Sequence, residues 1–460
     1  MVDDVALVTP PRRVSFRQRI LSAALWSLAG SGLGQVIRFA TNLLLTRLLV
    51  PNTFGVMAIA TIIMIGLQLF SDLGLKQSIV QSARGDRPEF LNTAWAVQIL
   101  RGFLLSALGL TAALLVFAAN RFGFAPHGSV YADIRLPYVI AALSSTAMIS
   151  GFGSTKLYEA GRNLVMARVT LIDLGTQLTN VVCILTWMFF DRTIWALVAG
   201  SIFSTLVNAI LTHAWLPGTA NSWRWDRPSL REIVGFGKWI FFSSILGFMV
   251  GNGDRLLLGG LIDSNSLGVY VIAFGMFSAA EQLLSRIITT VTFPALSEIV
   301  RERPAELKNT YYRMHSVVAT VAYFCSGVLI LAGHALIEVL YDARYLQAGW
   351  MLQILAIALL TVPFQVSVQC FLAMGMPHVL SSTTAVRLAS LLVSVPIGFF
   401  LLGLPGSLWG IVLSYFSNLP LLIYYRSKFD LFDTHRELLP LPVTLFGMAV
   451  AKLVLMAIGH

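Results

Sequence analysis

Thirteen stretches of this chain are apolar over a length that can cross a lipid bilayer, and this feature constrains the fold more than any other. A spanning helix needs about 20 consecutive, mostly apolar residues. The candidate spans are approximately residues 20–47, 52–77, 91–118, 132–155, 166–190, 193–215, 236–260, 266–298, 312–333, 347–373, 379–402, 406–425 and 438–458. Only 12% of the 460 residues are charged, whereas an ordinary soluble chain has about 25% charged residues. The sequence therefore predicts an all-α integral membrane protein with about 12–14 transmembrane helices.

One motif occurs twice, half the chain apart. The stretch LLLTRLLVPNTFGVMAIA (43–60) aligns without a gap on LLLGGLIDSNSLGVYVIA (256–273), and nine of 18 positions are identical at an offset of 213 residues. Each copy ends one span and opens the next. Because an offset of six helices keeps the membrane orientation, we expect two six-helix lobes related by a pseudo-two-fold axis along the membrane normal. The alternative is a chance match of leucine-rich segments, which explains the shared Gly55 and Gly268 less well.

The spans divide the chain into five parts. The longest loop lies midway, between the sixth and seventh spans, where a junction between two lobes would fall. We expect a cytoplasmic N-terminal tail (1–19), an N-lobe (20–216), a cytoplasmic interlobe linker (217–235), a C-lobe (236–425), and a C-terminal part (426–460) with a cytoplasmic loop and one additional membrane helix.

The distribution of basic residues predicts the orientation. With the N-terminus in the cytoplasm and alternating spans, 21 Lys and Arg residues fall in cytoplasmic segments and five fall outside. Cytoplasmic loops of membrane proteins carry such an excess of basic residues. The same excess accounts for the net charge of +10, so this charge does not need a nucleic-acid partner to explain it.

Several charged residues lie inside the predicted spans. An ionised side chain at the bilayer centre costs about 3 kcal/mol or more, so it should face a cavity or a partner. Arg38 and Arg255 fall on equivalent faces of the first and seventh spans, with Asn42 one turn beyond Arg38. Arginine presents a fixed fork of donors that suits phosphate. We therefore expect Arg38, Asn42, Asp254 and Arg255 to bind an anionic head group, the alternative being that Asp254 only neutralises an arginine.

A second set of charges follows the first along the spans. Asp72, Glu281 and Arg286 are candidates for ion or proton coupling or for gating. Pairing of Glu281 with Arg286, and of Asp72 with Lys76, is the structural alternative. No metal-ligand, nucleophile or nucleotide-binding motif stands out, so we expect a transporter without a cofactor and not an enzyme.

Two blocks of this sequence resemble a known family. LLTRLLVPNTFGVMAIATIIMIGLQLFSDLGLKQSIVQ is similar to the opening of bacterial Wzx-type oligosaccharide flippases, and GNGDRLLLGGLIDSNSLGVYVIAFGM is similar to their seventh-helix block. These flippases belong to the multidrug/oligosaccharidyl-lipid/polysaccharide exporter superfamily. The resemblance covers most of the first 300 residues in detail, and beyond them it rests on hydropathy alone. The family often has twelve or fourteen spans, so thirteen is a departure.

The resemblance implies a function. Such a protein would move an undecaprenyl-pyrophosphate-linked oligosaccharide from the cytoplasmic to the outer leaflet of the bacterial inner membrane by alternating access. The product would serve exopolysaccharide, capsule or lipopolysaccharide O-antigen synthesis. The implied partners are the lipid bilayer and the polysaccharide polymerase and export machinery. Arg38 and Arg255, carried over from the two matching blocks, would bind the pyrophosphate or acidic sugars.

Four other classes of protein remain to be weighed. A drug/cation antiporter of the same fold would favour acidic cavity groups. A lipid II flippase would also have a cationic cavity. A membrane glycosyltransferase or polymerase would need a catalytic motif such as D-x-D and a large outer loop, which this sequence lacks. A purely structural membrane protein would not need charges within its spans.

Overall fold

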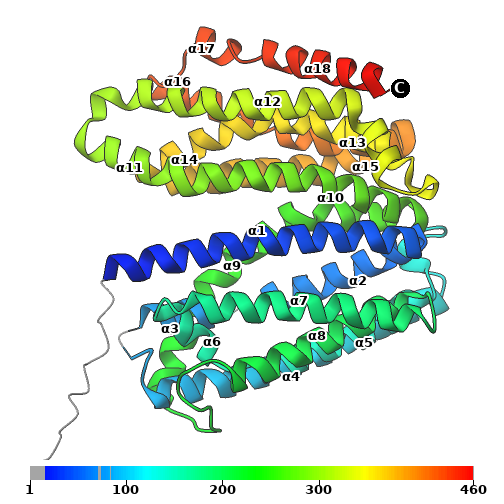
Figure 1. Cartoon of the computed structure of the whole chain (residues 1–460), viewed down its shortest axis with the longest axis vertical. Coiled ribbons are helices and arrows are strands. Elements are labelled where there is room, and N and C mark those ends of the chain that lie inside the picture. Colours follow the sequence, from blue (N-terminus) through cyan, green and yellow to red (C-terminus); the bar gives the residue numbers. More distant parts are fainter. Residues whose placement is uncertain (1–15, 71–73, 83, 459–460) are drawn as a thin grey trace, which may run out of the picture.

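The computed structural model describes residues 16–70, 74–82 and 84–458, and every regular element in these ranges is a helix (Figure 1). The first nine helices are α1 (Phe16–Leu48), α2 (Pro51–Phe70), α3 (Leu75–Gln81), α4 (Pro88–Arg121), α5 (Arg135–Gly151), α6 (Lys156–Arg162), α7 (Met166–Met188), α8 (Ile194–Ala214) and α9 (Arg227–Leu261). The others are α10 (Ser264–Ile287), α11 (Phe293–Glu302), α12 (Leu307–Leu340), α13 (Ala348–Ala356), α14 (Gln365–Ala373), α15 (Pro377–Phe416), α16 (Leu419–Lys428), α17 (Thr434–Leu438) and α18 (Pro442–Ile458). Short 3-10 helices are η1 (Val130–Ala132), η3 (Pro304–Glu306), η4 (Ala343–Tyr345) and η5 (Ile357–Phe364), and η2 (Ile288–Thr292) is a π-helical turn.

Each of the thirteen predicted spans overlaps a helix. By length and apolar composition, nine described helical segments could cross a membrane, or ten if the bent pair α5–α6 is one span. The long helices α1 and α9 carry more polar residues and fall outside that set. The 52-residue segment 377–428 is counted once, although it folds back on itself. The prediction of an all-helical membrane protein is confirmed.

The fold-back in α15 occurs at a glycine. Gly403 has φ +66°, in the left-handed region that residues with a Cβ rarely adopt. Beyond it the chain returns along the first arm, where Ser394 Oγ donates a 2.7 Å hydrogen bond to the Gly410 carbonyl. These two arms are the predicted spans 379–402 and 406–425.

The helices lie in two groups (Figure 1). α1, α2, α4, α5, α7 and α8 form the lower group, and α10 and α12 to α16 form the upper one, with α9 running between them. α2 packs on both α9 and α10 and so connects the groups. We call the lower group the N-lobe and the upper group, together with α9, the C-lobe.

The repeated motif forms the closest contact between the lobes. Gly55 in α2 and Gly268 in α10 face each other, because a Cβ on Gly55 would lie 3.1 Å from Gly268 N and a Cβ on Gly268 would lie 3.2 Å from Gly55 N. Each Cβ would also collide with a backbone carbonyl of the opposite helix. Small residues permit this close approach of two membrane helices, which accounts for the glycine in each copy.

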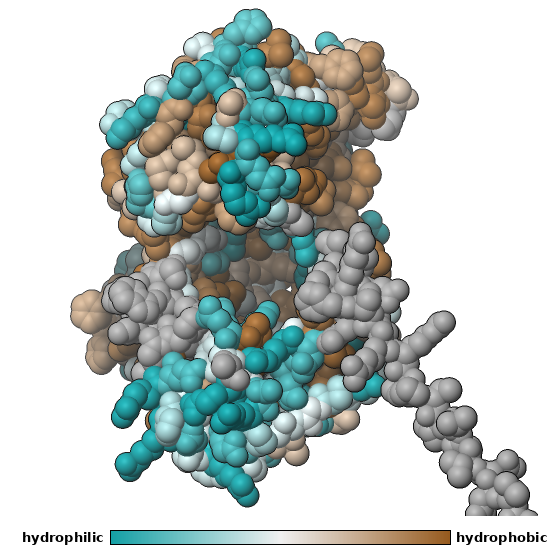
Figure 2. Space-filling model, turned by 90° about the vertical axis from the view of Figure 1, so that its left-hand side faces the viewer, coloured by the Kyte–Doolittle hydropathy of each residue, from teal (hydrophilic) through white to brown (hydrophobic). Residues whose placement is uncertain are grey.

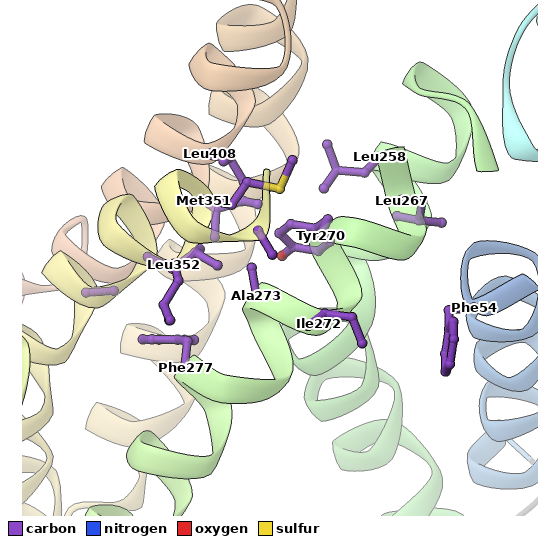
Figure 3. Close-up of a cluster of buried hydrophobic side chains, with 14 of the residues drawn as sticks. Phe54, Leu258, Leu267, Tyr270, Ile272, Ala273, Phe277, Met351, Leu352 and Leu408 are labelled. Atoms are coloured by element: carbon purple, nitrogen blue, oxygen red, sulfur yellow. The ribbon is translucent and has the colours of Figure 1, made fainter. Parts of the chain in front are cut away.

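Apolar side chains bind α10 to the rest of the C-lobe. Tyr270, Met351, Leu352 and Leu408 are fully buried and point toward one another from α10, α13 and α15 (Figure 3). This core holds α10 in a fixed position, so that its polar face can line the cavities described below.

The helix boundaries differ from the predicted ones at the interlobe linker. α9 begins at Arg227 and not at residue 236, because Asp226 caps it by accepting a 3.0 Å hydrogen bond from Ser229 N. Proline in the first turn also favours a helix start. The segment without regular structure is therefore 215–226, shorter than the predicted 217–235.

The thirteenth span lies at the periphery. α18 packs along α12 at the top of Figure 1, with Gly327 of α12 directly against the Thr444 backbone. The preceding helix α17 is held by a buried ion pair, in which Glu437 contacts Arg426. Arg426 is 1% exposed and also donates a 3.0 Å hydrogen bond to the Tyr311 hydroxyl.

Candidate functional site

A polar cavity lies within the C-lobe. It has a volume of about 450 Å³ and is lined by α9, α10 and both arms of α15. Its charged lining residues are Asp254, Arg255, Glu281 and Arg387. Two acidic and two basic side chains balance one another, so this cavity carries no formal net charge. We call it the C-lobe cavity.

Asp254 and Arg255 occupy one wall of this cavity. Asp254 is 4% exposed and accepts a hydrogen bond from the Tyr270 hydroxyl, while its other carboxylate oxygen, Oδ1, has no hydrogen-bond partner in the structure. Arg255 Nε lies 3.7 Å from the carboxylate, and its guanidinium lies 4.2 Å above the centre of the Phe274 ring. The predicted pairing of Asp254 with an arginine is therefore present, but it is loose, and Arg255 still lines the cavity.

Glu281 and Arg387 form a second part of the wall of this cavity. The Tyr415 hydroxyl donates a 3.3 Å hydrogen bond to Glu281 Oε2, and the Arg387 guanidinium lies 3.6 Å above the Tyr415 ring. Stacking of a guanidinium on an aromatic face leaves its edge donors available to a ligand. This wall combines an aromatic surface with hydrogen-bonding groups, as a polar organic ligand requires.

A second cavity lies between the lobes. It has a volume of about 290 Å³ and is lined by α1 and α7 of the N-lobe and by Arg286 of α10. Arg286 of α10 donates a 3.0 Å hydrogen bond to Ser31 Oγ of α1, in the other lobe. Arg38 donates a 2.8 Å hydrogen bond to Gln35 Oε1. Among the described residues Asp173 is the only acidic one in the lining, so there two arginines exceed one carboxylate. We call it the interlobe cavity.

Asn42 lines a smaller cavity next to this one. Arg38 borders both, and Asn42 Oδ1 accepts a 3.3 Å hydrogen bond from the Tyr341 hydroxyl. The small cavity has a volume of about 150 Å³. Arg38 and Asn42 are thus neighbours, as their spacing on α1 predicts.

The structure separates residues that the sequence places in one site. Asp254, Arg255 and Glu281 share the C-lobe cavity, whereas Arg38 and Arg286 share the interlobe cavity. Arg38 and Arg255 line different cavities. The expected convergence of these two arginines is not present in this conformation.

The alternative pairing of Glu281 with Arg286 is wrong. At 3.6 residues per turn, side chains five positions apart point about 140° away from each other. Glu281 consequently faces the C-lobe cavity and Arg286 faces the interlobe cavity. Asp72 lies outside the described residues.

Sequence reasoning missed Arg387. This residue lies within the predicted span 379–402, so the cost of a buried charge could have identified it as it did Arg255. It escaped notice because the family resemblance is detailed only over the first 300 residues. Gln177 and Asp173 of α7 were also missed, and only the fold shows that they face α1.

The molecule is hollowed between its lobes at the predicted cytoplasmic end. Figure 2 shows this end, with hydrophilic side chains on both lobes and a recess between them. At the opposite, predicted outer end, α2 and α10 are in close contact at Gly55 and Gly268. The arrangement gives a polar ligand access from one side of the membrane.

Comparisons with known proteins agree on one family. The family described as "Polysaccharide biosynthesis protein" matches residues 44–350. The lipopolysaccharide biosynthesis protein WzxC of Escherichia coli is 22% identical over 353 residues, which cover 75% of this chain and 68% of that protein. The teichuronic acid biosynthesis protein TuaB of Bacillus subtilis is 23% identical over 349 residues, with coverage of 75% and 68%.

Solved structures share the fold. An inward-facing multidrug resistance MATE family transporter of the MOP superfamily matches with a TM-score of 0.65 at 14% identity, covering 92% of this chain and 95% of its own. The lipid II flippase MurJ in an inward closed conformation also matches with a TM-score of 0.65, at 11% identity and with coverage of 95% and 100%. At such identities the likeness concerns the fold alone.

Proposed function

The chain belongs to the polysaccharide biosynthesis protein family, and on this premise we propose that it is a flippase for a polyprenyl-pyrophosphate-linked oligosaccharide. It is a transporter and not an enzyme, and it is a multi-pass protein of the bacterial inner membrane. The movement runs from the cytoplasmic to the outer leaflet, with the N-terminus in the cytoplasm. Its product would supply exopolysaccharide, capsule or O-antigen synthesis, in contact with a polymerase and export machinery.

The two cavities supply what transport of such a substrate requires, which is a polar path through the membrane. A sugar chain and a pyrophosphate cannot enter hydrocarbon without a polar path, because unsatisfied polar groups cost several kcal/mol each there. The polyprenyl tail can remain in lipid while the head group occupies the cavities. Two lobes that rock against each other would then expose the head group to one leaflet and afterwards to the other.

The presence of both Arg38 and Arg286 in the lining of the interlobe cavity carries the proposal. These arginines come from different lobes, and one bound pyrophosphate could contact both. Arginine binds phosphate oxygens with two parallel donors and keeps its charge at any physiological pH. We therefore assign Arg286, a candidate for gating in the sequence, to phosphate binding together with Arg38 and with Asn42, which lies next to Arg38.

The C-lobe cavity would take the sugars. Arg255, Asp254 and Arg387 offer donors and acceptors at the margin of aromatic rings, a combination that suits hydroxyl-rich ligands. Glu281 stays a candidate for ion or proton coupling. A drug/cation antiporter is disfavoured by the excess of arginine in the interlobe cavity, while a lipid II flippase shares that feature.

Substitution of the two interlobe arginines tests the proposal. Arg38→Ala and Arg286→Ala should each abolish surface polysaccharide in a host that lacks its own flippase gene, at unchanged protein abundance. Lysine at either position should restore export only in part, because it keeps the charge but loses the planar fork. Lys452→Ala is the matched control, since Lys452 is an exposed cation of α18 that lines neither cavity. Normal export by both alanine variants would overturn the assignment, and rescue of lipid II transport in place of polysaccharide export would favour the alternative substrate.

A further inference from the structure

A second internal repeat lies in the turns at the predicted outer end. Asp133 and Arg135 follow η1 in the N-lobe, and Asp342 and Arg344 stand at η4 in the C-lobe, at an offset of 209 residues. In each turn the Asp–x–Arg residues pair in the same way. Arg135 donates two hydrogen bonds to the Asp133 carboxylate, of 3.0 Å from Nε and 2.7 Å from Nη2. Arg344 donates two hydrogen bonds of 3.2 Å from the same atoms to the Asp342 carboxylate.

The C-lobe turn contacts the end of the N-lobe's first helix. Arg344 Nη2 donates a 3.4 Å hydrogen bond to the Thr46 carbonyl and a 3.1 Å hydrogen bond to the Arg47 carbonyl, both in the last turn of α1. The Tyr345 hydroxyl donates a 3.0 Å hydrogen bond to the carbonyl of Leu49, the residue that follows α1. The last carbonyls of a helix have no partner within the helix and carry partial negative charge. A guanidinium is therefore a favourable cap for α1.

The N-lobe turn contacts the equivalent part of the C-lobe. Val130 N donates a 3.1 Å hydrogen bond to the carbonyl of Ile262, the residue that follows α9. The Tyr131 hydroxyl donates a 3.1 Å hydrogen bond to the Leu256 carbonyl. Ile262 corresponds to Leu49 at the 213-residue offset of the main repeat. Each lobe thus places a turn next to or containing an Asp–x–Arg pair on the equivalent carbonyl of the other lobe, Leu49 or Ile262. In the C-lobe turn the arginine itself also contacts the other lobe, whereas in the N-lobe turn the preceding residues Val130 and Tyr131 make the contact. The Gly55–Gly268 contact lies at the adjacent helix starts.

We propose that the two Asp–x–Arg turns are reciprocal latches, which hold the outer ends of the lobes together and must release before the cavities open outward. Arg344 acts directly on the opposite lobe, and Asp342 fixes its guanidinium by two hydrogen bonds. Asp133 and Arg135 stiffen the opposite turn in the same manner. These four are positioning residues, since they set the balance between two conformations without touching the substrate. The inference rests on the proposed alternating-access function.

The latch stays charged over the working pH range. Hydrogen bonds from Arg344 hold the pKa of Asp342 below its ordinary value. Protonation that would release the arginine therefore occurs only at a pH below the range in which a free aspartate titrates. Opening of the latch must then come from movement of the lobes and not from a modest fall in external pH.

Sidedness of cysteine labelling tests the latch without any substrate. Cys183, Cys325 and Cys370 are first replaced by alanine, and Gly251→Cys supplies a single reporter in the C-lobe cavity. Gly251 is exposed and a Cβ there would meet no atom within 4 Å. A membrane-impermeant thiol reagent is added outside intact cells, and the rate of labelling is measured.

Arg344→Ala should raise the outside labelling rate about tenfold, because charge-assisted hydrogen bonds that close the outer end are lost. Arg121→Ala is the control, as Arg121 is an exposed arginine in the last turn of α4 at the same end. If Arg344→Ala does not accumulate, Tyr345→Phe removes one hydroxyl of the same contact and should raise the rate to a smaller extent. An unchanged rate in a normally abundant variant, or an equal rise in the control, would overturn the proposal.

Failure of the latch and failure of the proposed function are distinguishable in this design. Loss of export by Arg38→Ala with no effect of Arg344→Ala on labelling would reject the latch and leave the flippase intact. Increased labelling in a chain that exports no polysaccharide would support the latch and reject the function.

Discussion

Arg255→Ala separates a role in ligand binding from a role in a buried pair. Removing one partner of a buried ion pair costs about 3–5 kcal/mol. The 3.7 Å separation from Asp254 and the 20% exposure of the Arg255 side chain place this pair at the low end of that range. Loss of the stacking on Phe274 adds about 1 kcal/mol. We expect Arg255→Ala to destabilise the protein by about 4 kcal/mol in total.

The double variant Arg255→Ala/Asp254→Asn should recover most of that stability. The amide is neutral, and its oxygen can still accept the Tyr270 hydroxyl. Only the lost stacking, about 1 kcal/mol, should remain. Thermal unfolding in detergent and protein abundance in membranes measure this recovery.

Export should not recover with stability. If Arg255 contacts the substrate, the double variant will be abundant and folded but will leave little polysaccharide at the cell surface. Arg255→Lys should retain partial export because it keeps the charge but loses the fork of donors. Full export by the double variant would refute the binding role and leave Arg255 as half of a structural pair.

Three further experiments test the fold and the orientation. Cysteine at Phe124 should react with an impermeant reagent from outside and cysteine at Arg224 should not, and the opposite pattern would reverse the proposed orientation. Gly268→Ala should destabilise the protein by about 1–3 kcal/mol through overpacking against α2. Gly247→Ala, with open space around its Cβ, should leave the unfolding temperature unchanged or raise it slightly, because alanine favours a helix interior over glycine. Glu437→Gln should cost about 3–5 kcal/mol because it leaves a fully buried guanidinium without its counter-charge, and an unchanged unfolding temperature would show that the pair contributes little.

The sequence predicted the helices well because hydropathy is a local property. The break at Gly403 could be anticipated from two adjacent apolar runs. The repeat indicated that Gly55 and Gly268 are equivalent, but not that they contact each other. The start of α9 was missed by nine residues, because its first turns are polar and only the cap at Asp226 identifies them.

The division of the site into two cavities was not predictable from one sequence. A buried charge must face a cavity or a partner, but which cavity it faces depends on how neighbouring helices rotate and pack. By the predicted repeat, the packing of α1 on α7 is equivalent to that of α9 on α15, so each lobe has a cavity of its own, and Arg38 and Arg255 line different ones. The placement of Arg286 opposite α1 is likewise a consequence of interlobe packing and not of any local pattern.

Flipping by the purified protein is the most direct test of the central claim. The protein is reconstituted into liposomes with a lipid-linked oligosaccharide, and the fraction of substrate that becomes accessible to an impermeant sugar-oxidising reagent is followed over time. Wild-type protein should make substrate from the inner leaflet accessible faster than protein-free liposomes do, and the Arg38→Ala/Arg286→Ala variant should not. Equal rates for wild-type protein, the double variant and protein-free liposomes would contradict the account.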